Sequence, residues 1–126
     1  MDVAGSDGCD ITTIGIDIGK NTFHLIGLDR RGAIALQLKV PRAQLERRLA
    51  NVPPCLIGME ACSGARYIGR QLAALGRDVR LIPAQYVKPF LKGHKNDYRD
   101  AEAIAGGTRV AATIEWTAPV KYRSEE

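Results

Sequence analysis

Apolar and polar positions alternate along the first third of the chain, in three short runs. In residues 12–18, TTIGIDI, the isoleucines alternate with Gly15 and Asp17, which is the period of two that a β-strand shows. Asp17 is therefore expected to face away from the isoleucines. Residues 22–29 and 33–40 show a similar strand pattern, and each run follows a short turn, GKN or RRG. These runs predict three antiparallel strands joined as a meander.

Beyond residue 40 the pattern changes to helical segments that alternate with short apolar runs. Pro41 suits the first turn of a helix, and the apolar run CLIGME is typical of a buried parallel strand. One later helix is expected to have an apolar side, formed by Tyr67, Ile68, Leu72 and Leu75. The predicted elements after the meander are a helix over 41–52, a strand over 55–60, a helix capped by Ser63 that stops at Gly76, a strand over 78–83, a helix over 84–93 that Pro89 disturbs, and a last helix near Asp97. The order β-β-β-α-β-α-β-α predicts an α/β fold with one mixed sheet and right-handed crossovers.

Four acidic residues occupy positions where this fold would bind a ligand. Asp17 ends the first strand and Glu60 ends the fourth, and ligands bind at the carboxyl ends of neighbouring parallel strands. Asp97 and Asp100 are three residues apart, so a helix would turn both toward the sheet. Carboxylates brought together repel by about 4 kcal/mol per pair at 4 Å in an effective dielectric of 20, and a divalent cation relieves that repulsion. Oxygen ligands favour Mg²⁺ or Mn²⁺, which two-metal sites use for phosphoryl transfer.

Each acid also has a purely structural interpretation. Asp17 could form an Asx turn with Gly19, Asp97 could be a helix N-cap, and Asp100 could favour the helix dipole. Glu60 closes an apolar run, so partial burial and a compensating partner, such as a metal ion, are expected. His24 and His94 are too isolated in sequence to indicate a histidine-based site.

A basic cluster precedes and overlaps the last helix. It is interleaved with Tyr86, Phe90 and Tyr98, an arrangement expected of a surface that neutralises phosphates and stacks on bases. A solvated helix face is the simpler alternative, because Lys and Arg are common on any surface. The candidate nucleic-acid contacts are Lys88, Lys92, Lys95 and Arg99.

Composition limits the remaining possibilities. The 126 residues carry a formal net charge of +4 and are 45% hydrophobic, which fits one soluble domain. The three cysteines show no C-x-x-C spacing and predict neither a zinc site nor a disulfide framework. No run approaches the ~20 apolar residues of a membrane span, and residues 1–11 lack signal-peptide features, so a disordered tail and a cytoplasmic location are expected.

Three motifs, GIDIGKNTFHLIGLDRRG, GMEACSGARYIGRQLAALGRDVRLIPAQYVKPFLK and KNDYRDAEAIA, carry a family resemblance. Together, over residues 12–123, they resemble the N-terminal domain of DEDD transposases of the insertion-sequence 110 family, in particular its 1111 subgroup. The resemblance implies a RuvC-type ribonuclease-H-like fold and metal-dependent DNA cleavage and exchange during transposition. It implies a metal tetrad at Asp17, Glu60, Asp97 and Asp100. A bridge RNA that guides the reaction and a homo-oligomeric full-length protein are further implied partners.

The resemblance also suggests a domain layout. Residues 12–110 would form the RuvC-like DEDD domain, and residues 111–126 would be a linker toward a C-terminal serine transposase domain. The chain is then expected to be a truncated copy, which alone supplies at most weak metal-dependent nicking.

Two other classes of protein share some of these features. IGIDIGKNT also resembles the first phosphate loop of sugar kinases and actin-like ATPases, although the second glycine-rich motif of those proteins is missing. A non-catalytic nucleic-acid-binding module would use the basic residues alone. Its binding would be indifferent to divalent metal and to Asp17→Ala.

Overall fold

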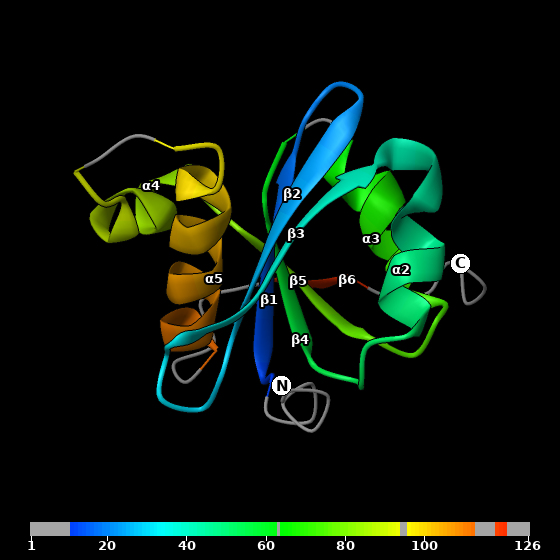
Figure 1. The fold of residues 1–126 in the computed structure, drawn as a ribbon, viewed down its shortest axis with the longest axis horizontal. Helices are drawn as coiled ribbons and strands as arrows, with labels where there is room; N and C mark the ends of the chain where they lie inside the picture. Colours follow the sequence, from blue (N-terminus) through cyan, green and yellow to red (C-terminus); the bar gives the residue numbers. More distant parts are fainter. Residues whose placement is uncertain (1–10, 63, 94–95, 113–117, 121–126) are drawn as a thin grey trace.

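The strands of the chain form one mixed sheet, seen in a computed structural model that describes residues 11–62, 64–93, 96–112 and 118–120 (Figure 1). The six-stranded sheet has the order β3-β2-β1-β4-β5-β6. The predicted meander is confirmed, because β1, β2 and β3 pair antiparallel, and β4 then pairs parallel with both β1 and β5. The strands are β1 (Thr13–Ile18), β2 (Thr22–Leu28), β3 (Ile34–Pro41), β4 (Leu56–Glu60), β5 (Asp78–Ile82) and β6 (Ala118–Val120).

Helices cover both faces of the sheet (Figure 1). On one face lie α2 (Leu45–Ala50) and α3 (Ala65–Ala73), and on the other α4 (Ala84–Val87) and α5 (Arg99–Ala111). Two short 3-10 turns, η1 (Arg42–Gln44) and η2 (Lys88–Phe90), precede α2 and follow α4. None of the helices in the described parts of the chain is long and apolar enough to cross a membrane.

Two predicted helices differ in the structure, and one strand was not predicted. Within the helix expected over 41–52, the structure has the 3-10 turn η1 followed by the shorter α-helix α2. The helix expected over 84–93 is divided into α4 and the 3-10 turn η2, which contains Pro89. The strand β6 was not predicted; it lies inside the segment expected to be a linker and pairs antiparallel with β5. A three-residue edge strand that contains proline has too short a pattern to be recognised from sequence. Residues 1–10 of the tail predicted over 1–11, and the cap Ser63, lie outside the described residues, whereas Ile11 is buried in the core and does not belong to a disordered tail.

Buried side chains on both faces of the strands form the core. Ile14 and Ile16 of β1 are fully buried and pack with the apolar sides of α2 and α3. On α3, Ile68 and Leu72 are buried, but Tyr67 is 61% exposed, so the prediction that Tyr67 shares the apolar side is wrong. The apolar side of α3 is a narrow stripe, since residues four apart align along a helix whereas Tyr67 is rotated away from them. Leu75, also predicted on that side, lies beyond the end of α3 and is exposed.

Two glycines let α5 lie directly against the sheet. A Cβ atom on Gly15 of β1 would lie 2.5 Å from the carbonyl oxygen of Ala101, and one on Gly58 of β4 would overlap the side chain of Thr108. Close approach of a helix to a strand is a role to which glycine is suited. The helix is thereby seated over β1 and β4, and its first turn stands at the end of the sheet where both strands finish (Figure 1).

Candidate functional site

Asp17 lies near the carboxyl end of β1 and is half-buried. Its strand partner is His24 of β2, and the His24 ring packs edge-on against Tyr98, with 5.2 Å between ring centroids. The backbone N–H of Gly19 donates to the carbonyl oxygen of Thr22, so the Asx turn considered for Asp17 is not formed. The Asp17 carboxylate therefore has no such structural role at the strand end.

The charges around Asp17 show which acids stand beside it. Burial is the main cause that raises the pKa of Asp17 above its ordinary value, because it penalises the charged form. The carboxylate of Asp100 raises this pKa further, His24 lowers it, and Glu60 raises it. Glu60 lies near Asp17 because β4, which it ends, pairs parallel with β1. Asp100 lies near Asp17 because it belongs to the first turn of α5. Three of the four predicted acids thus gather at one end of the sheet.

Asp97 is placed differently from the prediction. The helix begins only at Arg99, with Tyr98 at the N-cap, and the backbone N–H of Tyr98 donates to the side-chain oxygen of Asn96 at 2.8 Å. The proposed N-cap role of Asp97 is wrong, as is a helical face shared with Asp100. Asp97 is exposed and lines a hollow of about 470 Å³ with Gln37 of β3. Within the described residues, no three His, Cys, Asp or Glu side chains are grouped closely enough to hold one metal ion.

Two nitrogen atoms near these acids are buried without a hydrogen-bond partner among the described residues, Nε2 of His24 and Nε of Arg99. Sequence reasoning set His24 aside as isolated. The hairpin register was the missed signal, because pairing Ile18 with Phe23 across the turn places His24 opposite Asp17.

The predicted basic face is only partly a free surface. Lys88 and Lys92 are exposed, and Lys92 forms a 3.6 Å ion pair with Glu102. Arg99, another of the predicted nucleic-acid contacts, is half-buried. Lys95 and His94 lie outside the described residues.

Comparison with known proteins matches the sequence of this chain to one family. The sequence profile of the IS110 type of DEDD transposase, described as transposase, matches residues 14–124. The transposase for insertion sequence element IS1328 of Yersinia enterocolitica is 46% identical over 99 residues, which are 79% of this chain and 30% of that protein. The transposase for insertion sequence element IS1111A of Coxiella burnetii is 41% identical over 96 residues, 76% of this chain and 26% of that protein. The chain spans less than a third of the length of these relatives.

Solved structures give the fold. RuvC of Thermus thermophilus in complex with a Holliday junction substrate superimposes with a TM-score of 0.65 at 15% identity, over 86% of this chain and 99% of RuvC. A second Thermus thermophilus RuvC structure gives a TM-score of 0.62. The expected RuvC-type, ribonuclease-H-like fold is confirmed. The chain therefore belongs to the IS110 family of DEDD transposases and corresponds to their N-terminal, RuvC-like domain.

Proposed function

We propose that this chain is the metal-dependent domain that cleaves and exchanges DNA strands during transposition of an insertion sequence. The proposed metal ligands are Asp17, Glu60, Asp97 and Asp100, and the proposed nucleic-acid contacts are Lys88, Lys92, Lys95 and Arg99. The observation that carries the proposal is that β1, β4 and the first turn of α5 bring Asp17, Glu60 and Asp100 to the same end of the sheet. Carboxylate oxygens are the donors that Mg²⁺ or Mn²⁺ prefers, and a bound cation would have to draw these side chains closer together than the described residues hold them.

The residues differ in how firmly the fold holds them. Asp17 is held by β1 in a half-buried setting, where electrostatic interactions are stronger than in water. Half-buried Glu60 of β4 and Asp100, which is exposed in the first turn of α5, reach the same end of the sheet. Asp97 is exposed in the segment before α5, so a bound cation would have to recruit it from solvent. When bound, the divalent ion would supply positive charge for phosphoryl transfer.

DNA as the substrate follows from the relatives and from the surface. The relatives are transposases, and the RuvC neighbour is held with a Holliday junction. Exposed Lys88 begins η2, which contacts α5, and exposed Lys92 pairs with Glu102 of α5, so both offer positive charge to phosphates on the α5 side of the sheet. The same proposal includes a bridge RNA and a homo-oligomer for the full-length protein. It places the reaction in the cytoplasm, where a bacterial chromosome lies.

Metal binding tests the proposal directly. Mn²⁺ binding to the chain is measured by electron paramagnetic resonance, together with nicking of a four-way DNA junction, for the parent chain and for Asp17→Asn. The matched control is Asp78→Asn, because Asp78 is an exposed aspartate at the opposite end of the parallel strands. We expect Asp17→Asn to lose Mn²⁺ binding and any nicking, and the control to keep both. Equal Mn²⁺ binding by the parent chain and Asp17→Asn would reject the proposed site and favour a non-catalytic binding module.

A further inference from the structure

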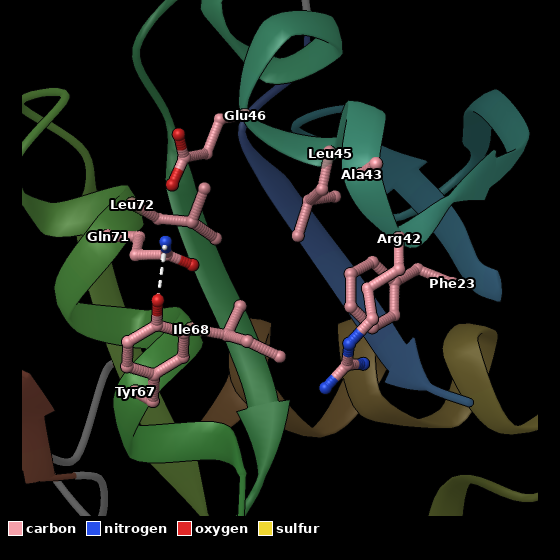
Figure 2. Close-up of a pocket in the computed structure, with 9 residues that line it drawn as sticks. All are labelled: Phe23, Arg42, Ala43, Leu45, Glu46, Tyr67, Ile68, Gln71 and Leu72. Carbon is pink, nitrogen blue, oxygen red and sulfur yellow. Dashed lines mark hydrogen bonds between the residues drawn. The ribbon is translucent and has the colours of Figure 1, made fainter. Parts of the chain in front are cut away.

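A second site candidate lies on the other face of the sheet from Asp17. A hollow of about 270 Å³ opens between η1, α2 and α3, and we call it the Arg42–Tyr67 pocket (Figure 2). Buried Leu45, Ile68 and Leu72 give it an apolar wall. Polar groups surround this wall, with Arg42 on one side and Gln71 on the other in the view of Figure 2. An apolar hollow with a few polar groups is the usual form of a site for a small planar group.

Arg42 is fixed in place although it is exposed. Its guanidinium carbon lies 5.1 Å from the centroid of the Phe23 ring, and its Nη1 donates to the carbonyl oxygen of Gly19 at 3.4 Å. Its backbone N–H donates to the carbonyl oxygen of Asn21 at 3.0 Å. Both carbonyls belong to the turn that directly follows the strand of Asp17. The pocket and the acidic residues therefore occupy the same end of the sheet, on its two faces.

Tyr67 presents an exposed aromatic ring to the same pocket. The Tyr67 side chain is 61% exposed, and its hydroxyl accepts a hydrogen bond from Nε2 of Gln71 at 3.2 Å (Figure 2). This bond restrains the ring on the surface of α3. A large aromatic side chain gains little stability from such exposure, whereas a nucleobase could stack on it.

The charges select the kind of ligand. Arg42 brings a planar cation on which a base can stack, as bases do on arginine in single-stranded nucleic acid. Glu46 lines the same pocket, and its carboxylate would repel a phosphate but would accept a hydrogen bond from the amino group of a base. The combination suits the base of a nucleotide better than its phosphate.

We propose that the Arg42–Tyr67 pocket receives one unpaired base of the DNA substrate, stacked on Tyr67 and on the guanidinium of Arg42. The inference rests on the proposed function, because it takes DNA as the substrate. It adds a contact on the α2–α3 face to the lysines predicted on the α5 face. One unpaired base would thereby be held beside the turn that follows Asp17.

The test compares two DNA duplexes that differ in one unpaired nucleotide. The fluorescent base 2-aminopurine is placed either in a single-nucleotide bulge or in a fully paired position, and binding to the 126-residue chain is followed without divalent metal. We expect tighter binding of the bulged duplex and a change in 2-aminopurine fluorescence on stacking. Tyr67→Ala should reduce the preference for the bulge by at least roughly fivefold, the equivalent of about 1 kcal/mol of stacking.

Matched variants separate stacking from folding and from charge. Tyr67→Phe keeps the ring and should keep most of the preference. Arg42→Ala should lose it, whereas Arg48→Ala removes an exposed arginine of α2 outside the pocket and should weaken binding of both duplexes equally. Circular dichroism establishes that each variant is folded, and its Mn²⁺ binding should match that of the parent chain.

The outcomes distinguish this inference from the proposed function. Equal binding of both duplexes, or a preference that Tyr67→Ala leaves unchanged, would overturn the pocket inference and leave the metal-site proposal standing. A larger effect of Tyr67→Ala on a bulged RNA than on the bulged DNA would also overturn it and assign the pocket to RNA. Binding of neither duplex would overturn the pocket inference and the proposal that DNA is the substrate. The metal site is tested separately, by comparing the Mn²⁺ binding of the parent chain with that of Asp17→Asn.

Discussion

Replacing Gly15 with alanine tests how the fold sets the position of α5. The added methyl group would lie 2.5 Å from the carbonyl oxygen of Ala101 and 2.8 Å from Cα of Ala105. Both are backbone atoms, so no rotamer change can relieve the contact. To restore an ordinary contact of 3.4 Å, α5 must withdraw from β1 by about 1 Å.

The expected loss of stability follows from this geometry. Overpacking of a well-packed core costs about 1–3 kcal/mol, and a backbone clash places Gly15→Ala at the upper end of that range. Alanine in a strand interior recovers roughly 0.5–1 kcal/mol of backbone entropy relative to glycine. We therefore expect a net loss of about 2 kcal/mol in the free energy of unfolding, or about 8 °C in melting temperature.

The assay is urea and thermal unfolding of Gly15→Ala beside Gly93→Ala. Gly93 has no atom within 4 Å of a built Cβ, so its substitution should change the free energy of unfolding by no more than about 0.5 kcal/mol. Because α5 carries Asp100, the Gly15 variant should also bind Mn²⁺ more weakly, since withdrawal of α5 moves one of the proposed ligands away from Asp17. If Gly15→Ala is as stable as the parent chain and binds Mn²⁺ equally well, the close seating of α5 is refuted.

Three further outcomes follow from single side chains. Since the pKa of Asp17 is raised on folding, ionisation of Asp17 destabilises the folded chain above the ordinary pKa of 3.8. Without divalent metal, Asp17→Asn should therefore melt at a higher temperature than the parent chain at pH 7. The difference in melting temperature should vanish below pH 3.8. Arg77 donates through Nη2 to the carbonyl oxygens of Leu49 in α2, at 3.1 Å, and of Val52 just beyond it, at 2.8 Å. Arg77→Ala should therefore lower the free energy of unfolding in urea by about 1–2 kcal/mol. The control Arg47→Ala, at an exposed position of α2, should change it little. Burial raises the pKa of the Cys55 thiol to about 11, so peptide mapping after alkylation at pH 8 should find Cys55 modified more slowly than exposed Cys62.

Local patterns were enough to predict most of the elements. The alternation in β1 reports its two faces directly, because successive side chains of a strand point to opposite sides, and so the side on which Asp17 lies was predictable. The meeting of Asp17 with Glu60 was also predictable, since it needs only the parallel pairing of two strands that end in an acid.

Other features depend on contacts between distant segments. The start of α5 was missed because the side chain of Asn96 satisfies the N–H of Tyr98, and this leaves Asp97 outside the helix. The strand β6 exists through its pairing with β5, which three residues cannot encode alone. Arg42 and Tyr67 belong to segments with no shared pattern, and only the packing of α2 and α3 on one face of the sheet brings them to one pocket. Periodicity records which side of an element is buried, whereas the neighbour that buries it is chosen by the whole chain.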